Sequence, residues 1–173
     1  MTAQAAYWLL PAVIPLALYI SWNDMRTMKI TNNSMLVLFG AFVVLGPFAF
    51  GFPTYFWQLL HGPVVLVVGM AIWALRLVGG GDAKMLAAMA PYFWLDDLRL
   101  ILIVFVAASL GALITHSIFR FTPLHKLTPD WASWSAGKGN LRGGILGLNL
   151  AFPKGTALSL TLVVYLLLVA IYR

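Results

Sequence analysis

The sequence predicts an all-α, polytopic integral membrane protein with about six transmembrane helices and the amino terminus outside. Of the 173 residues, 62% are hydrophobic and only 9% are charged, whereas soluble domains are about half apolar and about a quarter charged. The apolar residues also form runs long enough for helices to cross about 30 Å of hydrocarbon. This composition excludes a soluble enzyme and a disordered tail, and we expect residues 1–173 to form a single membrane-embedded domain.

Six apolar segments mark the expected spans. They cover residues 6–22, 34–50, 60–77, 83–95, 98–119 and 156–172. The fourth segment is the shortest, and Pro91 weakens its far end because proline disrupts a helix interior. If that end reaches the opposite surface, Asp82 lies at or just inside the hydrocarbon boundary.

The distribution of cations predicts the orientation. With the amino terminus outside and six spans alternating, nine of the eleven Lys and Arg residues face the cytoplasm, while Arg99 and Arg173 face outward. Cytoplasmic loops of membrane proteins carry such an excess of cations. No Lys or Arg precedes the first span, so we expect a retained helix and not a cleaved secretory signal.

Residues 120–154 form the expected cytoplasmic basic loop, which holds five cations against Asp130. The net charge of +6 is spread between apolar runs, so the lipid bilayer is the expected partner and no nucleic acid is expected. Five glycines make the loop a poor helix, which leaves a partly re-entrant path open.

The composition also limits the chemistry. The chain has no Cys and no Glu, and its three His residues are scattered. Thiolate zinc sites and Cys nucleophiles are therefore excluded, and we expect no metal site and no cofactor.

The five Asp residues are the main functional signal in so apolar a chain. Asp96 and Asp97 fall in an outward turn and are interpreted as hydrated loop charges, and Asp130 fits a turn after proline. Asp24 and Asp82 instead stand at the cytoplasmic ends of two apolar spans. A carboxylate beside hydrocarbon is costly and is by default a functional candidate.

Three glycines, Gly79, Gly80 and Gly81, come directly before Asp82. Without Cβ atoms the backbone there can bend sharply and let another chain come close, so an extended peptide substrate could lie against it. A helix that starts at Ala83 would direct its free amides and the positive end of its dipole toward Asp82.

Each of these residues also has a simpler interpretation. Asp24 could be a hydrated charge beside Arg26, and Asp82 could be only the N-cap of the following helix. Asn32 is expected to act as a cap or turn residue of the second span, with substrate contact as the lesser alternative. Lys84 is expected to extend toward the lipid headgroups, with an influence on Asp82 as the alternative.

Three motifs together resemble the prepilin peptidases, which are polytopic aspartic proteases of the Gly-x-Gly-Asp type. The motifs are Asp24-x-Arg26-x-x-x-Ile30-x-Asn32, Gly79-x-Gly81-Asp82-x-Lys84 and Pro153-x-Gly155-x-Ala157. The resemblance implies that Asp24 and Asp82 are catalytic. It implies substrate-binding or supporting roles for Gly79, Gly80, Gly81, Arg26, Asn32, Lys84, Pro153 and Gly155.

The chain departs from the family pattern in three ways. It has no Cys and no room for the cytoplasmic insert that many bifunctional members carry, so it resembles the short, peptidase-only branch of tight-adherence pilus systems. Thr31 stands where the family commonly has Pro, and Lys154 where an aromatic residue is common. These two departures affect the expected shape of the pocket and leave the acidic pair intact.

The resemblance implies a function in pilus biogenesis and protein secretion at the bacterial cytoplasmic (inner) membrane. The expected partner is a type IV-like prepilin whose basic leader stays cytoplasmic and is cut off at the membrane face. Two nearby carboxylates cannot both ionise cheaply, so one would keep a proton while the other activates a water molecule. The sequence leaves open the identity of the prepilin, the oligomeric state, any methyl transfer and which Asp is protonated.

Two other functions stay open. A Gly-x-Gly-Asp protease of other membrane helices or signal peptides would place both aspartates deeper in spans than Asp24, which follows Trp22 at an interface. A non-catalytic channel, transporter or assembly subunit would show polar residues at mid-span. We expect the interiors of spans one, two, three and six to be almost wholly apolar.

Overall fold

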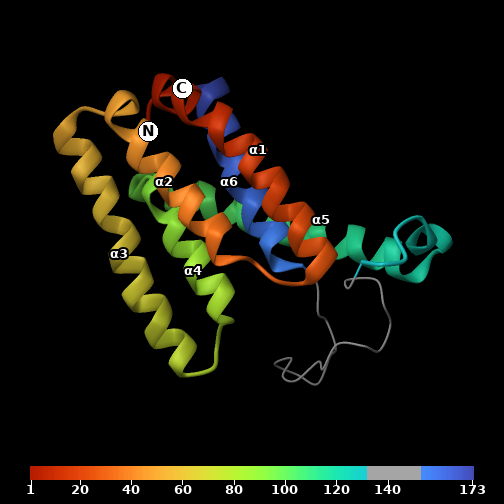
Figure 1. Cartoon of the computed structure of the whole chain (residues 1–173). Coiled ribbons are helices and arrows are strands. Elements are labelled where there is room, and N and C mark those ends of the chain that lie inside the picture. The colour runs from red at the N-terminus through yellow and green to blue at the C-terminus, as the bar shows by residue number, and fades with distance from the viewer. Residues whose placement is uncertain (132–152) are drawn as a thin grey trace.

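The described residues form a bundle of helices without strands (Figure 1). The computed structural model describes residues 1–131 and 153–173. The α-helices are α1 (Ala3–Thr27), α2 (Asn32–Ala49), α3 (Phe52–Ala74), α4 (Gly80–Met89), α5 (Leu98–Phe121) and α6 (Lys154–Tyr172). Two short 3₁₀ turns, η1 (Ala90–Tyr92) and η2 (Leu95–Asp97), join α4 to α5, and a third, η3 (Pro123–Leu127), follows α5. The all-α prediction is confirmed for this part of the chain.

In the described part of the chain, five helices are long and apolar enough to cross a membrane, namely α1, α2, α3, α5 and α6. The fourth predicted span is made differently, because α4 has only 10 residues. Pro91 lies in η1, where its missing N–H cannot continue an α-helix, and η1 and η2 complete the path to α5. The chain is therefore a multi-pass membrane protein, as predicted.

The third helix begins at Phe52, well before the predicted residue 60. Gly51 is its N-cap and Pro53 lies in its first turn, where a proline loses no helical hydrogen bond. The earlier start brings Gln58 into the span, and its side chain is only 2% exposed. The helix thus includes a buried polar residue that lies outside the predicted range 60–77.

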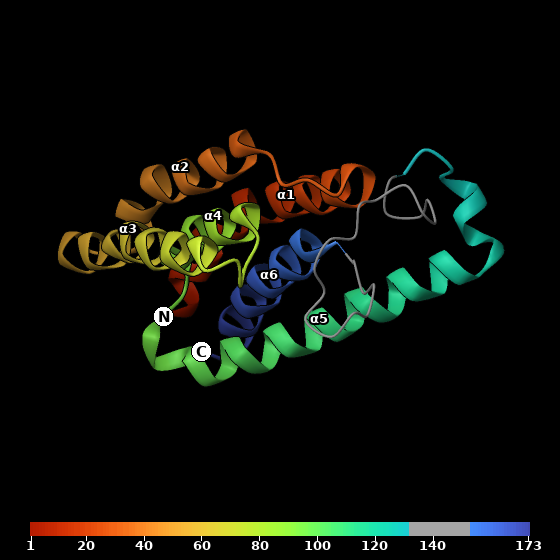
Figure 2. The same ribbon diagram turned by 90° about the horizontal axis from the view of Figure 1, so that it is seen from below.

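The centre of the bundle is α6, which lies beside α1 in both views (Figures 1 and 2). Over half of the apolar window of α6 is buried, against about a tenth of that of α3. Helices in lipid gain little from the hydrophobic effect and instead associate through close packing of small residues. Ala5 and Ala6 of α1 and Ala157 of α6 are accordingly buried.

Small residues also fix α4 against α3. A Cβ atom on Gly69 would lie 3.1 Å from the Cβ of Ala83, and one on Gly62 would lie 3.4 Å from the carbonyl oxygen of Ala87. The two backbones therefore approach closely at two levels. This packing positions the first turn of α4, which carries Asp82.

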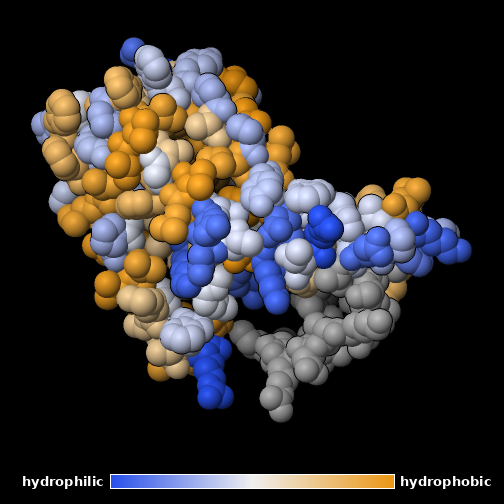
Figure 3. Space-filling view, in the orientation of Figure 1, coloured by the Kyte–Doolittle hydropathy of each residue, from blue (hydrophilic) through white to orange (hydrophobic). Residues whose placement is uncertain are grey.

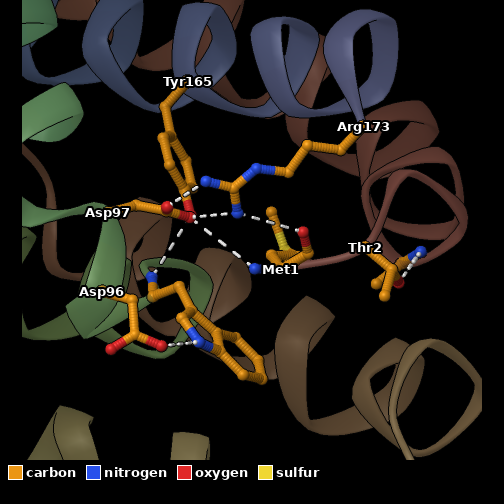
Figure 4. A network of polar contacts seen from close by, with 8 residues as sticks. Met1, Thr2, Asp96, Asp97, Tyr165 and Arg173 are labelled. Atoms are coloured by element: carbon orange, nitrogen blue, oxygen red, sulfur yellow. Dashed lines mark hydrogen bonds and ion pairs between the residues drawn. The ribbon is translucent and has the colours of Figure 1, made fainter.

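Asp97 lies at the end of the bundle where the two chain ends meet (Figure 4). It is buried, so the prediction that it is a hydrated loop charge is wrong. Both terminal nitrogens of Arg173 bind its carboxylate, and the Tyr165 hydroxyl donates to Oδ2 at 2.8 Å. The main-chain nitrogen of Met1 lies 3.6 Å from the same oxygen. Neighbouring Asp96 is exposed, as predicted. Asp97 is buried because it connects the start of α5 to α6.

The surface matches this architecture. Hydrophobic residues cover most of α2 and α3 in Figure 3, and hydrophilic residues gather around the start of α2 and the end of α1. Most of the predicted basic loop 120–154 lies outside the described residues.

Candidate active site

Asp24 lies in the last turn of α1 and is buried, with 4% of its surface exposed. Its carbonyl oxygen accepts the N–H of Met28 at 2.8 Å, and Met28 has the left-handed φ of 53° that ends the helix. The Asn23 amide donates to the carbonyl of Lys29 at 2.9 Å and holds the turn that follows. This turn directs Ile30 back toward Asp24.

The amino-terminal end of α6 meets the Asp24 carboxylate. The N–H of Thr156 donates to Oδ2 of Asp24 at 3.2 Å, and the Thr156 hydroxyl donates to the carbonyl of Ser21 at 3.4 Å. The first N–H groups of a helix have no partner within the helix, and the helix dipole favours a negative charge at this end. Asp24 therefore satisfies an otherwise unpaired donor of α6.

Gly155 makes this approach possible. A Cβ atom at that position would lie 2.9 Å from both Cγ and Oδ2 of Asp24, and 3.0 Å from Cγ1 of Ile30. Pro153 is the N-cap residue of α6, with a φ of −68°. The Pro-x-Gly sequence thus starts the helix and leaves room for the carboxylate.

Asp82 lies inside the first turn of α4, whose N-cap is Gly79. The helix thus begins before Ala83, and the interpretation of Asp82 as its N-cap residue is wrong. A Cβ atom on Gly79 would lie 3.0 Å from Oδ2 of Asp82. The same oxygen lies 3.5 Å from Nζ of Lys154, and the Asp82 side chain is 18% exposed.

The two carboxylates thus meet successive residues of one helix. Lys154 contacts Asp82, while Gly155 and Thr156 contact Asp24. Ile30 joins the two sides, since Cβ atoms on Gly81 and Gly155 would lie 3.8 Å and 3.0 Å from it. Figure 1 shows the end of α1 and the starts of α4 and α6 at the same end of the bundle.

Two of the predicted supporting residues pair with each other. Nζ of Lys84 donates to Oδ1 of Asn32 at 3.1 Å. Asn32 is the first residue of α2, and its expected role as a cap is taken by Thr31, whose hydroxyl accepts the N–H of Ser34 at 3.3 Å. The threonine that departs from the family pattern therefore acts as the helix cap.

Two other predicted residues contact tryptophans. The guanidinium of Arg26 lies 5.4 Å from the ring centre of Trp22, and its side chain is exposed. Among the described residues no ion pair joins Arg26 to Asp24. A Cβ atom on Gly80 would lie 3.2 Å from Nε1 of Trp73.

Three contacts were not predicted from the sequence, although Ile30 and Lys154 stand in the quoted motifs. Thr156 binds Asp24 through its backbone, Lys154 binds Asp82, and Ile30 lies between the glycines of both motifs. The N–H of Thr156 could have been found, because it lies in the first turn after the Pro-x-Gly motif. The contact of Lys154 has no signal in the sequence, since it depends on how α4 packs against α6.

A buried carboxylate and a partly exposed one at a single helix end are suited to general acid–base chemistry. Asp24 is held by a backbone amide and Asp82 by an ammonium group. Within residues 1–131 and 153–173 no group of three His, Asp or Glu side chains is arranged to hold a metal ion.

Comparison with known families bears on this site. The family model described as "Type IV leader peptidase family" matches residues 12–116, a stretch that includes Asp24, the glycines and Asp82. No curated protein and no solved structure matches the chain.

Proposed function

Because the chain belongs to the type IV leader peptidase family, we propose that it is an aspartic endopeptidase that cleaves the leader peptide from type IV-like prepilins. Asp24 and Asp82 are the proposed catalytic residues. The observation that carries the proposal is that both carboxylates contact the first three residues of α6. We further assign the chain to the short, peptidase-only branch of tight-adherence pilus systems, because it has no Cys.

The proposed reaction is direct hydrolysis of the peptide bond. The ionised carboxylate takes a proton from a water molecule, whose oxygen attacks the scissile carbonyl carbon. The protonated carboxyl group donates its proton to the carbonyl oxygen. The tetrahedral intermediate then collapses, the C–N bond breaks, and the leaving amine takes up a proton. No acyl-enzyme forms, and the two Asp residues act as one titrating pair.

The place of the site fits such a substrate. Asp24 is in the last turn of a candidate span, and Asp82 is in the first turn of α4. A precursor with a basic leader in water and an apolar helix in the bilayer would present its cleavage site at this level. We propose that this is the cytoplasmic face of the bacterial inner membrane, because most cations then lie inside.

The first test is cleavage of a prepilin by purified variants in detergent. Asp24→Asn and Asp82→Asn should each abolish release of the leader peptide, because an amide neither accepts a proton from water nor supplies one. Asp130→Asn is the matched control, since Asp130 is exposed and lies outside the proposed site. It should cleave at the wild-type rate.

The same assay separates the alternatives. A protease of other membrane helices would cleave such a helix while leaving the prepilin intact. A transporter or assembly subunit would cleave neither substrate. Wild-type processing by either Asn variant would remove that residue from the mechanism.

A further inference from the structure

A groove of about 550 Å³ lies between α2, α3 and α4, and neither Asp24 nor Asp82 lines it. Its only polar lining residues are Asn32, which is the first residue of α2, and Lys84, which is the fifth residue of α4. The rest of the lining is apolar, and it consists of Met35, Leu36, Phe39, Gly62, Pro63, Leu66, Ala87 and Ala88. The groove therefore has one charged end and an apolar length.

Three residues of the lining are small, namely Gly62, Ala87 and Ala88. A Cβ atom on Gly62 would lie 2.6 Å from the ring of Phe39 and 3.4 Å from the carbonyl oxygen of Ala87. From Asn32 to Phe39 the groove follows α2 for about 10 Å, at about 1.5 Å per helical residue. Its rim is open, because Leu36 is 69% exposed.

The groove opens between candidate spans, so its occupant must be apolar. An apolar cavity is not filled stably by water, and an unfilled one would forfeit packing contacts. A helix with its side chains is about 10–12 Å wide. A thinner chain, such as the acyl tail of a lipid, fits along it.

The positive charge of Lys84 at one end of the groove favours an anionic lipid headgroup there. Nζ of Lys84 bonds to the neutral Asn32 oxygen at 3.1 Å. Among the described residues, no carboxylate forms an ion pair with Lys84, since Asp82 pairs with Lys154. The Lys84 side chain is exposed, so its ammonium group can meet a phosphate at the polar end of the groove. Basic pockets between membrane helices bind anionic headgroups in this way.

We propose that this groove is a binding site for one anionic phospholipid, with an acyl chain along α2, α3 and α4 and the headgroup phosphate on Lys84 and Asn32. Neither proposed catalytic aspartate lines this groove, although the family resemblance implies supporting roles in the peptidase for Asn32 and Lys84. We expect the protein to distinguish lipids by the charge of the headgroup, and this preference to depend on Lys84.

Native mass spectrometry of the purified full chain tests the proposal. The protein is titrated with phosphatidylglycerol or phosphatidylcholine of identical acyl chains, and the bound lipid is counted. We expect wild type to retain one phosphatidylglycerol in preference to phosphatidylcholine. Lys84→Gln should weaken phosphatidylglycerol binding about fivefold, the share expected of one cation near the surface. Lys84→Arg should restore it.

Two further variants keep the result interpretable. Lys29→Gln removes an exposed cation that does not line the groove, and it should leave the lipid preference unchanged. Leu36→Trp places bulk at the exposed rim, where folding tolerates it, and should weaken both lipids equally because it obstructs the acyl chain.

Three results would overturn the assignment. They are equal binding of both lipids by wild type, wild-type headgroup preference in Lys84→Gln, and undiminished lipid binding in Leu36→Trp. Displacement of the lipid, one for one, by an apolar helical peptide would assign the groove to a polypeptide instead.

Discussion

The space beside Asp24 is set by a single missing side chain. Gly155 places its backbone where a Cβ atom would come within 2.9 Å of the carboxylate, and Gly79 does the same to Asp82 at 3.0 Å. The 2.9 Å contact would force the Asp24 side chain to move, whereas the 3.0 Å contact would require only a small displacement of Asp82. Both neighbours are proposed catalytic groups. At Gly81 the nearest atom would be 3.8 Å away, which is ordinary contact.

Alanine substitutions at these glycines should therefore impair cleavage in a fixed order. We expect Gly155→Ala to be the most harmful, Gly79→Ala intermediate and Gly81→Ala the least harmful. A displacement of about 1 Å of a reacting group can cost about 10²-fold in rate, and that is the expected scale for Gly155→Ala. The measurement is kcat/KM for leader cleavage by each variant.

Gly40→Ala is the control for this series. Gly40 lies within α2, and a Cβ atom there would meet nothing within 4 Å. Equal losses in all four variants would show that the effect comes from the helices in general and not from the crowded carboxylates.

At the scale of elements, α6 carries an acidic contact at each end, and the two differ in burial. At its start, Lys154 is 57% exposed at the side chain where it meets Asp82. At its other end, Arg173 binds Asp97, whose side chain is only 3% exposed. Exposed pairs contribute little to stability, whereas loss of one partner from a buried charge leaves the other poorly solvated.

The two pairs should therefore respond differently to mutation. Lys154→Gln should change the free energy of unfolding by less than about 1 kcal/mol. Arg173→Gln should lower it by about 1–3 kcal/mol, because the buried Asp97 carboxylate loses its cation. Reversible unfolding in mixed micelles, followed by circular dichroism, measures both values. A larger loss in Lys154→Gln than in Arg173→Gln would contradict this ranking of the two contacts.

Most helices follow from apolar runs alone, but three local features do not. The start of α3 at Phe52 depends on the Gly51 cap and Pro53, which the hydrophobicity pattern at 60–77 does not register. The sequence predicts a bend at the three glycines 79–81, but α4 begins at Gly80, so two of the three glycines are helical. From the sequence alone Asp97 is interpreted as a loop charge, because Arg173, which binds it, is distant in the chain.

For the whole molecule, the path of the chain places its two ends together. Arg173 Nη1 donates to the carbonyl of Met1 at 3.3 Å. The end of α1 and the start of α4, which carry Asp24 and Asp82, lie at the opposite end of the bundle (Figure 1). If α4 with η1 and η2 counts as one crossing beside the five candidate spans, the described crossings are even in number. An even number of crossings brings both chain ends to the same side. The orientation of the bundle in the membrane remains a prediction from the cations.

Cysteine labelling can test that orientation directly, because the chain has no Cys. Gly51→Cys lies in the α2–α3 turn, where a Cβ atom meets nothing within 4 Å. Lys29→Cys lies in the exposed α1–α2 turn. With the amino terminus outside, a membrane-impermeant maleimide should label Gly51→Cys in intact cells and Lys29→Cys only after the membrane is opened. The reverse pattern would contradict the proposed cytoplasmic site.

The acidic pair could be selected from the sequence because only five carboxylates had to be compared, and two of them end apolar spans. The resemblance of the flanking motifs supplied their proposed role. The parts that the sequence did not supply are the contacts through α6, because the Thr156 amide and the Lys154 ammonium reach the pair only after α1, α4 and α6 have packed.

The most direct test of the shared role of Asp24 and Asp82 is the residual rate of leader cleavage in Asp24→Asn, Asp82→Asn and the double variant. Residues that act as a unit are strongly non-additive. The double variant should lose little beyond either single variant. Two partial losses that multiply in the double variant would show that the two carboxylates act independently, which would contradict their shared role.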